Sequence, residues 1–156
     1  MTKNIQFDAI DRRIIAALQN DASPSQNALA EQVGTSPASC WRRVRALEEA
    51  GVFRGTVRLV DPDALGRAVT IVAQVRMRAH DQAACDAFED FVAAHEEIME
   101  CYSMSGEWDY QLLVVMADVA AYEKFLMREL LVHPAVATAS SHFALKRVKY
   151  STAIAV

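Results

Sequence analysis

Residues 36–51 read SPASCWRRVRALEEAG, and this stretch decides the fold of the N-terminal part of the chain. Ser36 suits a helix N-cap, and Pro37 suits the first helical position, where the N–H that proline lacks would be unpaired anyway. Gly51 supplies a stop, because glycine enters the left-handed conformation at little steric cost. One apolar stripe runs along the predicted helix at Cys40, Val44 and Leu47.

Three arginines, Arg42, Arg43 and Arg45, point away from this stripe. A short helix with small residues at its start, one buried stripe and a cationic outer side fits the major groove of DNA. An ordinary surface helix with solvated arginines gives the same pattern. The helix alone does not separate these two interpretations.

The preceding residues decide between them. Asp8 and Asp11 form a capping pair for a predicted helix over residues 8–20. A second helix is predicted to end at Gly34, with its cap at either Ser23 or Ser25. Two short helices joined by a glycine-containing turn define a helix-turn-helix, in which the second helix reads DNA. Trp41 either packs between helices or lies near the DNA, and packing is the more common outcome for so large a side chain.

Composition and charge agree with two small domains. The chain has 156 residues, of which 53% are hydrophobic, so it can bury a substantial core. The net charge of −4 divides unevenly, with +2 on residues 1–60 and −6 on residues 61–156. A basic N-terminal part facing DNA explains this asymmetry. No apolar run is long enough for a membrane span and no secretory leader is evident, so a cytoplasmic location is predicted.

The C-terminal part alternates between strand and helix patterns. Residues 52–60 are predicted to form a strand, and the turn at 61–63 marks the boundary after it. From residue 69 onward the order is β-α-β-β-α-β, which is that of a ferredoxin-like antiparallel sheet with helices on one face. Apolar residues on both sides of the strands indicate that a partner subunit covers the other face.

The fold class is therefore α+β, with a winged-helix-like helix-turn-helix domain followed by a ferredoxin-like βαββαβ domain. The predicted divisions are residues 1–51 for the DNA-binding domain, 52–66 for a strand and linker, and 67–156 for the second domain. A two-fold dimer with paired reading helices would match a pseudo-palindromic DNA site.

The turn at Ser105–Asp109 is the second candidate site. Gly106 allows the backbone to present N–H groups at close range, and Glu107 and Asp109 place carboxylates beside it. Such a turn can hold a zwitterion, with the carboxylates facing its ammonium group and Trp108 giving apolar surface. A plain hairpin turn with solvated acids fits the same residues.

Several of these segments together resemble one known family. They are FDAIDRRIIAALQNDAS at 7–23, LAEQVGTSPASCWRRVRALEEAGVFRG at 29–55, DPDALG at 61–66, CYSMSGEWDYQLLV at 101–114 and YEKFL at 122–126. In this combination the chain resembles the Lrp/AsnC family of transcription regulators along nearly its whole length. The resemblance implies a ligand-sensing C-terminal domain whose glycine-to-aspartate turn lines an amino-acid pocket at a dimer interface.

Two sets of site residues follow from the helix-turn-helix and the resemblance. The predicted DNA-binding residues are Ser25, Gln26, Ser36, Ala38, Ser39, Arg42, Arg43 and Arg45. The predicted effector-binding residues are Met104, Ser105, Gly106, Glu107, Trp108, Asp109 and Tyr110, with Thr138 and Ser140 as the partner wall of the pocket.

The functional hypothesis is a sequence-specific DNA-binding transcription regulator modulated by a small effector, most simply an amino acid. It acts as a homodimer that assembles into higher oligomers such as octamers. The alternative is an architectural DNA-binding protein of the same fold that needs no effector. An enzyme built on a dimeric ferredoxin-like barrel is a third reading, but the scattered histidines and single cysteines give no catalytic, metal or cofactor motif.

Overall fold

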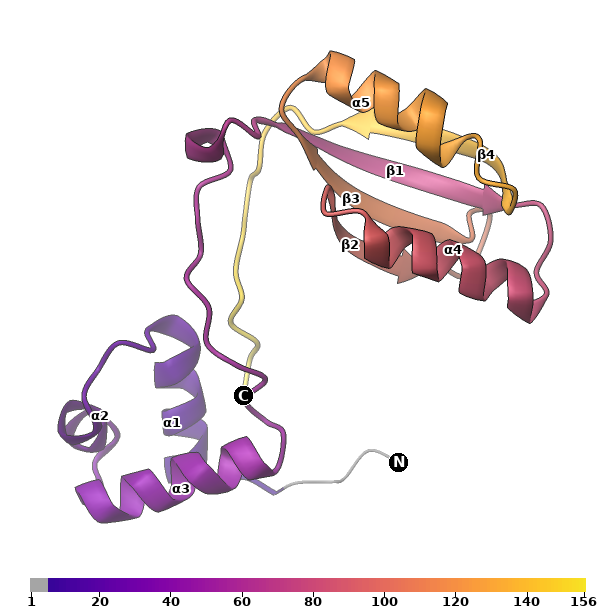
Figure 1. Ribbon diagram of the computed structural model, residues 1–156. Helices are drawn as coiled ribbons and strands as arrows, with labels where there is room; N and C mark the ends of the chain where they lie inside the picture. The colour runs from indigo at the N-terminus through magenta and orange to yellow at the C-terminus, as the bar shows by residue number, and fades with distance from the viewer. Residues whose placement is uncertain (1–5) are drawn as a thin grey trace. The chain divides into compact units, whose positions relative to one another are not determined.

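The computed structural model describes residues 6–156 and divides the chain into two compact units. One unit contains residues up to 58 together with 148–156, and the other contains residues 59–147. The first is helical and the second is built on a β-sheet (Figure 1). The division differs from the predicted one, because the last nine residues group with the N-terminal helices.

Three helices form the first unit: α1 (Ala9–Asn20), α2 (Gln26–Val33) and α3 (Pro37–Glu49). Asp8 caps α1, and its carboxylate accepts hydrogen bonds from the N–H groups of Ile10 and Asp11 at 2.8 and 2.9 Å. Ser25 caps α2, which settles the choice between Ser23 and Ser25. The buried residues between the three helices are Ile14, Ile15, Leu29, Ala30, Val33, Cys40 and Leu47.

The predicted strand over residues 52–60 is wrong. Residues 53–60 have no regular secondary structure, and the strand pairs among the described residues all lie between residues 69 and 143. An alternating pattern of β-branched residues favours an extended chain, but a strand also needs a neighbour for its N–H and C=O groups. Within the described chain, this segment has no such neighbour.

The C-terminal tail returns to α1. The side-chain amide of Gln19 donates to the carbonyl oxygen of Ile154 at 3.0 Å and accepts from the N–H of the same residue at 2.7 Å. The pair copies the double hydrogen bond that two antiparallel strands exchange. It explains why the tail belongs to the helical unit.

The second unit is a four-stranded antiparallel sheet in the order β2-β3-β1-β4. Its strands are β1 (Val69–Met77), β2 (Ile98–Ser103), β3 (Tyr110–Met116) and β4 (Val136–Phe143). The helices α4 (Gln82–Ala94) and α5 (Val119–Phe125) lie on one face, and α5 continues into a π-helical turn at Leu126–Leu130 (Figure 1). A short 3-10 turn, Asp63–Leu65, precedes β1. The predicted βαββαβ order is confirmed.

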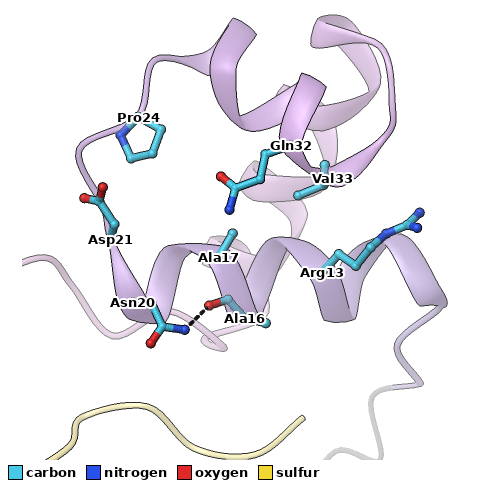
Figure 2. A pocket seen from close by; sticks show the side chains of 8 residues that line it. All are labelled: Arg13, Ala16, Ala17, Asn20, Asp21, Pro24, Gln32 and Val33. Atoms are coloured by element: carbon cyan, nitrogen blue, oxygen red, sulfur yellow. Dashed lines mark hydrogen bonds between the residues drawn. The ribbon is translucent and has the colours of Figure 1, made fainter.

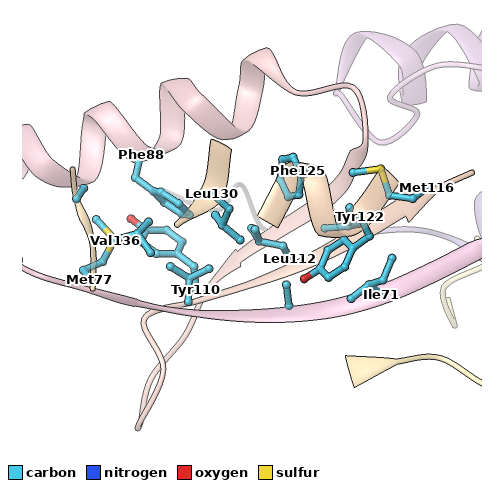
Figure 3. Packing of buried hydrophobic residues seen from close by; sticks show 14 residues of the cluster. Ile71, Met77, Phe88, Tyr110, Leu112, Met116, Tyr122, Phe125, Leu130 and Val136 are labelled. Carbon is cyan, nitrogen blue, oxygen red and sulfur yellow. The ribbon is translucent and has the colours of Figure 1, made fainter. Parts of the chain in front are cut away.

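The core of this unit lies between the sheet and its two helices (Figure 3). Alternate residues of β1 point into it, and Ile71, Ala73 and Val75 are fully buried. Phe88 of α4 and Leu112 of β3 are likewise inaccessible. The intervening residues of each strand therefore form the opposite face, which neither α4 nor α5 covers. None of the helices in residues 6–156 is long and apolar enough to cross a membrane.

Candidate nucleic-acid interface and ligand site

The turn between α2 and α3 sets the direction of the second helix. Gly34 ends α2 in the left-handed conformation, with φ of 71°, and its N–H donates to the last carbonyls of that helix. Ser36 then caps α3, where its hydroxyl accepts from the N–H of Ser39 at 3.3 Å. Both predicted cap serines, Ser25 and Ser36, thus stand at helix starts, where exposed backbone N–H groups favour phosphate.

The starts of α2 and α3 enclose a surface hollow of about 530 Å³. The residues that line it are Gln26, Pro37, Ala38, Trp41 and Arg42. Three of the predicted DNA-binding residues, Gln26, Ala38 and Arg42, are therefore brought together at one place. Arg42 forms no ion pair with another residue of the described chain, so its charge is available to a ligand.

For Trp41 the sequence left two outcomes open, packing between helices or a place near the DNA. The side chain does not pack in the core, because it is 48% exposed and lines the hollow. The guanidinium of Arg45 lies 5.7 Å from the centre of its ring, which is within the range of a cation–π contact. The helical period contained the signal, because Trp41 lies one residue, or about 100°, beyond the buried Cys40.

Arg43 lies apart from this hollow. One nitrogen of its guanidinium is 2.7 Å from a carboxylate oxygen of Asp8 and 2.7 Å from one of Asp11. The N–H of Asp11 first, and then Arg43, lower the pKa of the Asp8 carboxyl. Arg43 was predicted to contact DNA, yet the structure commits its charge to joining α3 to the start of α1. Asp8 and Asp11 already cap α1, whose N-terminus favours carboxylates, so nothing in the local sequence marked their pairing with Arg43.

A second hollow of about 370 Å³ lies between α1 and α2 (Figure 2). Its walls come from residues such as Ala17, Asn20 and Gln32, and none of the predicted site residues lines it. The amide of Asn20 donates to the carbonyl of Ala16 at 2.7 Å, so that side chain is already used within α1.

In the second unit, the turn at residues 104–109 is anchored by Asp109. One carboxylate oxygen accepts from the N–H of Met77 at 2.7 Å, and the other lies 2.8 Å from Nε2 of His80. Partial burial acts to raise the pKa of Asp109, but the Met77 N–H and then His80 outweigh it, and the pKa is lowered. Asp109 is therefore ionised and holds the turn against the end of β1.

Arg76 is a further side chain of this site that sequence reasoning missed. Its guanidinium bonds to the Glu107 carboxylate at 2.8 Å and to the Glu107 carbonyl at 3.2 Å, and it lies 5.1 Å from the centre of the Trp108 ring. In β4, the predicted residue Thr138 pairs in register with Arg76, and Ser140 pairs with Gln74. The open face of the sheet thus brings Thr138 and Ser140 to the same end as the turn.

Tyr110 lies on the other side of the sheet. It was predicted to bind an effector, but its ring is 5% exposed and packs 4.8 Å from the Phe88 ring, among the core residues of Figure 3. Its hydroxyl donates to the Glu89 carboxylate at 3.0 Å, and burial raises its pKa. At the turn, Tyr110 therefore offers only its backbone.

Comparison with known proteins places this arrangement in a family. The model for the Lrp/AsnC ligand binding domain matches residues 70–154, and a model for a winged helix-turn-helix DNA-binding domain matches residues 7–54. The chain belongs to the Lrp/AsnC family of transcription regulators. It is a DNA-binding regulator with a ligand-binding domain.

Individual relatives match along most of their length. The DNA-binding transcriptional activator DecR of Escherichia coli K12 is 33% identical over 96% of this chain and 99% of its own. The leucine-responsive regulatory protein of the same strain is 35% identical over 96% of this chain and 92% of its own. A solved transcriptional regulator from Neisseria meningitidis, in complex with L-Met, has a TM-score of 0.92 and 31% identity, with 96% of each chain covered. The structure of an AsnC family transcriptional regulator from Agrobacterium tumefaciens has a TM-score of 0.90 and 37% identity to this chain.

Proposed function

We propose that this regulator reads pseudo-palindromic DNA as a homodimer through the start of α3. The observation that carries the proposal is the hollow between α2 and α3, where Gln26, Ala38 and Arg42 meet at an exposed surface. Arg42 and Arg45 supply the positive charge that phosphates and guanine edges attract. Arg43 acts indirectly, by holding α3 against α1 through Asp8 and Asp11.

The test is a fluorescence anisotropy titration on duplexes from upstream of the protein's own gene. The double variant Arg42→Ala with Arg45→Ala is expected to weaken binding at least tenfold and to reduce the slope of log affinity against log salt concentration. The control variant is Lys124→Ala with Arg128→Ala, which removes the same charge from the second unit. Equal affinity and an equal salt slope for the wild type and the α3 variant would exclude α3 as the reading helix.

The second part of the proposal is an amino-acid effector at the turn of residues 104–109. The turn has the features such a ligand needs: backbone N–H groups around Gly106 for a carboxylate, and the ionised Asp109 beside them for an ammonium group. Each Asp109 oxygen keeps a lone pair for the ligand beyond its bond to Met77 or His80. Support also comes from the Neisseria meningitidis relative, which was solved with L-Met. Effector binding would favour one arrangement of dimers over another, such as an octamer, and would act only if it binds the two unequally.

A thermal-shift screen of the twenty amino acids tests this part, with L-Met first. A ligand that binds only the native state raises Tm in proportion to the logarithm of its concentration. Asp109→Asn is expected to abolish the shift, whereas Asp90→Asn, on the exposed side of α4, leaves it intact. No shift with any amino acid would favour the architectural reading, in which the protein multimerises on DNA without an effector. As a DNA-binding regulator it is assigned to the cytoplasm.

A further inference from the structure

The hollow at the start of α3 is apolar where DNA-reading surfaces are usually polar. Pro37, Ala38 and Trp41 give it apolar lining, and Gln26 and Arg42 are its polar lining residues. An exposed tryptophan is costly to leave in water, because its large apolar surface gains most when it is covered. The hollow therefore has the character of a contact surface rather than of a solvated helix end.

The helical period places this hollow on the outward side of α3. Ala38, Trp41 and Arg45 follow one another at intervals of three and four residues, so they share one face of the helix. The buried stripe, which contains Cys40 and Leu47, faces the other way. The outward face thus presents an apolar patch at its N-terminal end and arginine beyond it, which is the charge pattern that a phosphate-lined groove complements.

The Trp41 ring already has a neighbour in Arg45. Arg45 lies 5.7 Å from the centre of the ring, one helical turn further along, and a contact between them restricts both side chains. Arg45 itself is 3.5 Å from the Glu48 carboxylate. A tryptophan side chain has only two rotatable bonds and loses little entropy on binding, so it is well suited to recognise one small apolar group.

The major groove of DNA offers one such group. Thymine alone among the four bases displays a methyl group there, and its partner adenine displays a donor and an acceptor that suit the side-chain amide of glutamine. The hollow carries both complements, because apolar side chains and Gln26 line it together. We propose that the hollow formed by Pro37, Ala38 and Trp41 receives the C5-methyl group of a thymine in each half-site. This inference rests on the proposed reading of DNA by α3.

The experiment removes the methyl group and nothing else. A random duplex library is selected on the full chain, and each thymine of the selected duplex is then replaced in turn by deoxyuridine. At one thymine position per half-site, the replacement is expected to weaken binding of the wild type about fourfold, the effect of uncovering one buried methyl group. Anisotropy titrations at one fixed salt concentration measure the ratio of the two affinities.

The variants assign the effect to the hollow. Trp41→Ala is expected to bind the thymine and uracil duplexes with equal affinity, and Trp41→Phe to keep part of the preference. Met127→Ala, which trims an exposed apolar side chain of the second unit, keeps the full ratio. Each variant is expected to fold, because Trp41 lies outside the buried cluster of the helical unit. Circular dichroism checks this.

Failure of the thymine inference can be distinguished from failure of the proposed DNA binding. A selected duplex whose affinity is unchanged by uracil at every position would overturn the inference and leave DNA binding by α3 in place. The inference would also fall if Trp41→Ala kept the fourfold ratio. A chain that enriches no duplex above the starting library would overturn the proposed function itself, and the inference with it.

Discussion

Two side chains of this protein make contacts other than those that their residue type and sequence neighbours suggest. Arg43 belongs to a cationic helix but neutralises Asp8 and Asp11 of another helix. Tyr110 sits beside a glycine turn but donates to Glu89 across the core. In each case the direction of the Cα–Cβ bond decides, and it follows from the period of the element that carries the residue.

The contacts of a single histidine, His95, lead us to expect that the stability of the protein depends on pH. Its Nδ1 donates to the Phe91 carbonyl at 2.6 Å, and its Nε2 lies 2.8 Å from the Glu129 carboxylate. Burial acts to lower the pKa of His95, but the Phe91 carbonyl, Glu129 and Glu97 outweigh it, so the pKa rises above 6.5. The folded state therefore holds the proton more tightly than the unfolded chain does.

A group with a raised pKa contributes its full stabilisation below the unfolded pKa of 6.5 and loses it as the pH rises through the folded value. Urea unfolding at pH 6 and pH 8.5 should show this loss as a lower His95-dependent contribution to the free energy of unfolding at the higher pH. His95→Gln removes the difference, and Glu129→Gln reduces it. His80→Gln, a more exposed histidine, serves as the control. A wild-type curve with the same pH response as His95→Gln would contradict the assignment.

Whole elements differ in how far local sequence specifies them. Helix starts were predictable because a cap and its helix are neighbours in the chain, as Asp8, Asp81 and Asp118 show. The order of the strands was predictable where alternation and flanking turns agree, as in β3 (Tyr110–Met116). The strand expected at 52–60 failed because pairing depends on a distant neighbour that the alternation does not reveal.

The same contrast divides the candidate site. The three helices and the turn between α2 and α3 followed from local sequence, and these elements bring Gln26, Ala38 and Arg42 to one hollow. The partners of Arg43 and Arg76 did not follow, because each contact joins residues more than thirty positions apart. Long-range pairing of charged side chains leaves no periodic mark in the sequence.

The turn between α2 and α3 makes a prediction at the element scale. Gly34 has φ of 71°, and a Cβ atom added there would meet nothing within 4 Å. Any cost of substitution is therefore a cost of backbone conformation alone. Gly34→Ala should destabilise the protein by about 1–2 kcal/mol, the usual penalty of the left-handed region for a residue with a Cβ atom.

Gly34→Asn is the matched variant, because asparagine enters the left-handed region more readily than alanine does. Thermal unfolding followed by circular dichroism should rank the stabilities as glycine, then asparagine, then alanine. The reverse order of asparagine and alanine would mean that space or polarity, and not φ, sets the penalty at this turn.

At the scale of the whole molecule, the second face of the sheet stands out, because neither α4 nor α5 covers it. Val72 and Leu113 lie directly opposite each other on it and are half-buried. A sheet with apolar side chains on its second face gains by covering that face with another layer. A second copy of the chain supplies this layer in the homodimer that we propose.

Light scattering coupled to size exclusion tests the dimer. Leu113→Glu places a charge at the centre of the face, where dimer formation would bury it without a partner, so the variant is expected to elute as a monomer. Met127→Glu makes the same change on the helical side, where the residue is exposed, and should keep the mass of the wild type. A Leu113→Glu chain with an unchanged mass would exclude this face as the interface.

The double hydrogen bond between Gln19 and Ile154 makes the ligand-binding unit an insertion within the DNA-binding one. The chain leaves the helical unit near residue 58 and re-enters it near residue 148. The chain enters β1 and leaves β4 at the same end of these two neighbouring strands, where the N–H of Ala144 bonds to the carbonyl of Thr70 at 2.9 Å. Insertion at closely spaced ends is a common way to build one domain into another. A chimaera that exchanges sensing units between relatives therefore needs two junctions, one near residue 58 and one near residue 148. A chimaera with a single junction near residue 58 would give the DNA-binding unit the last segment of the other protein.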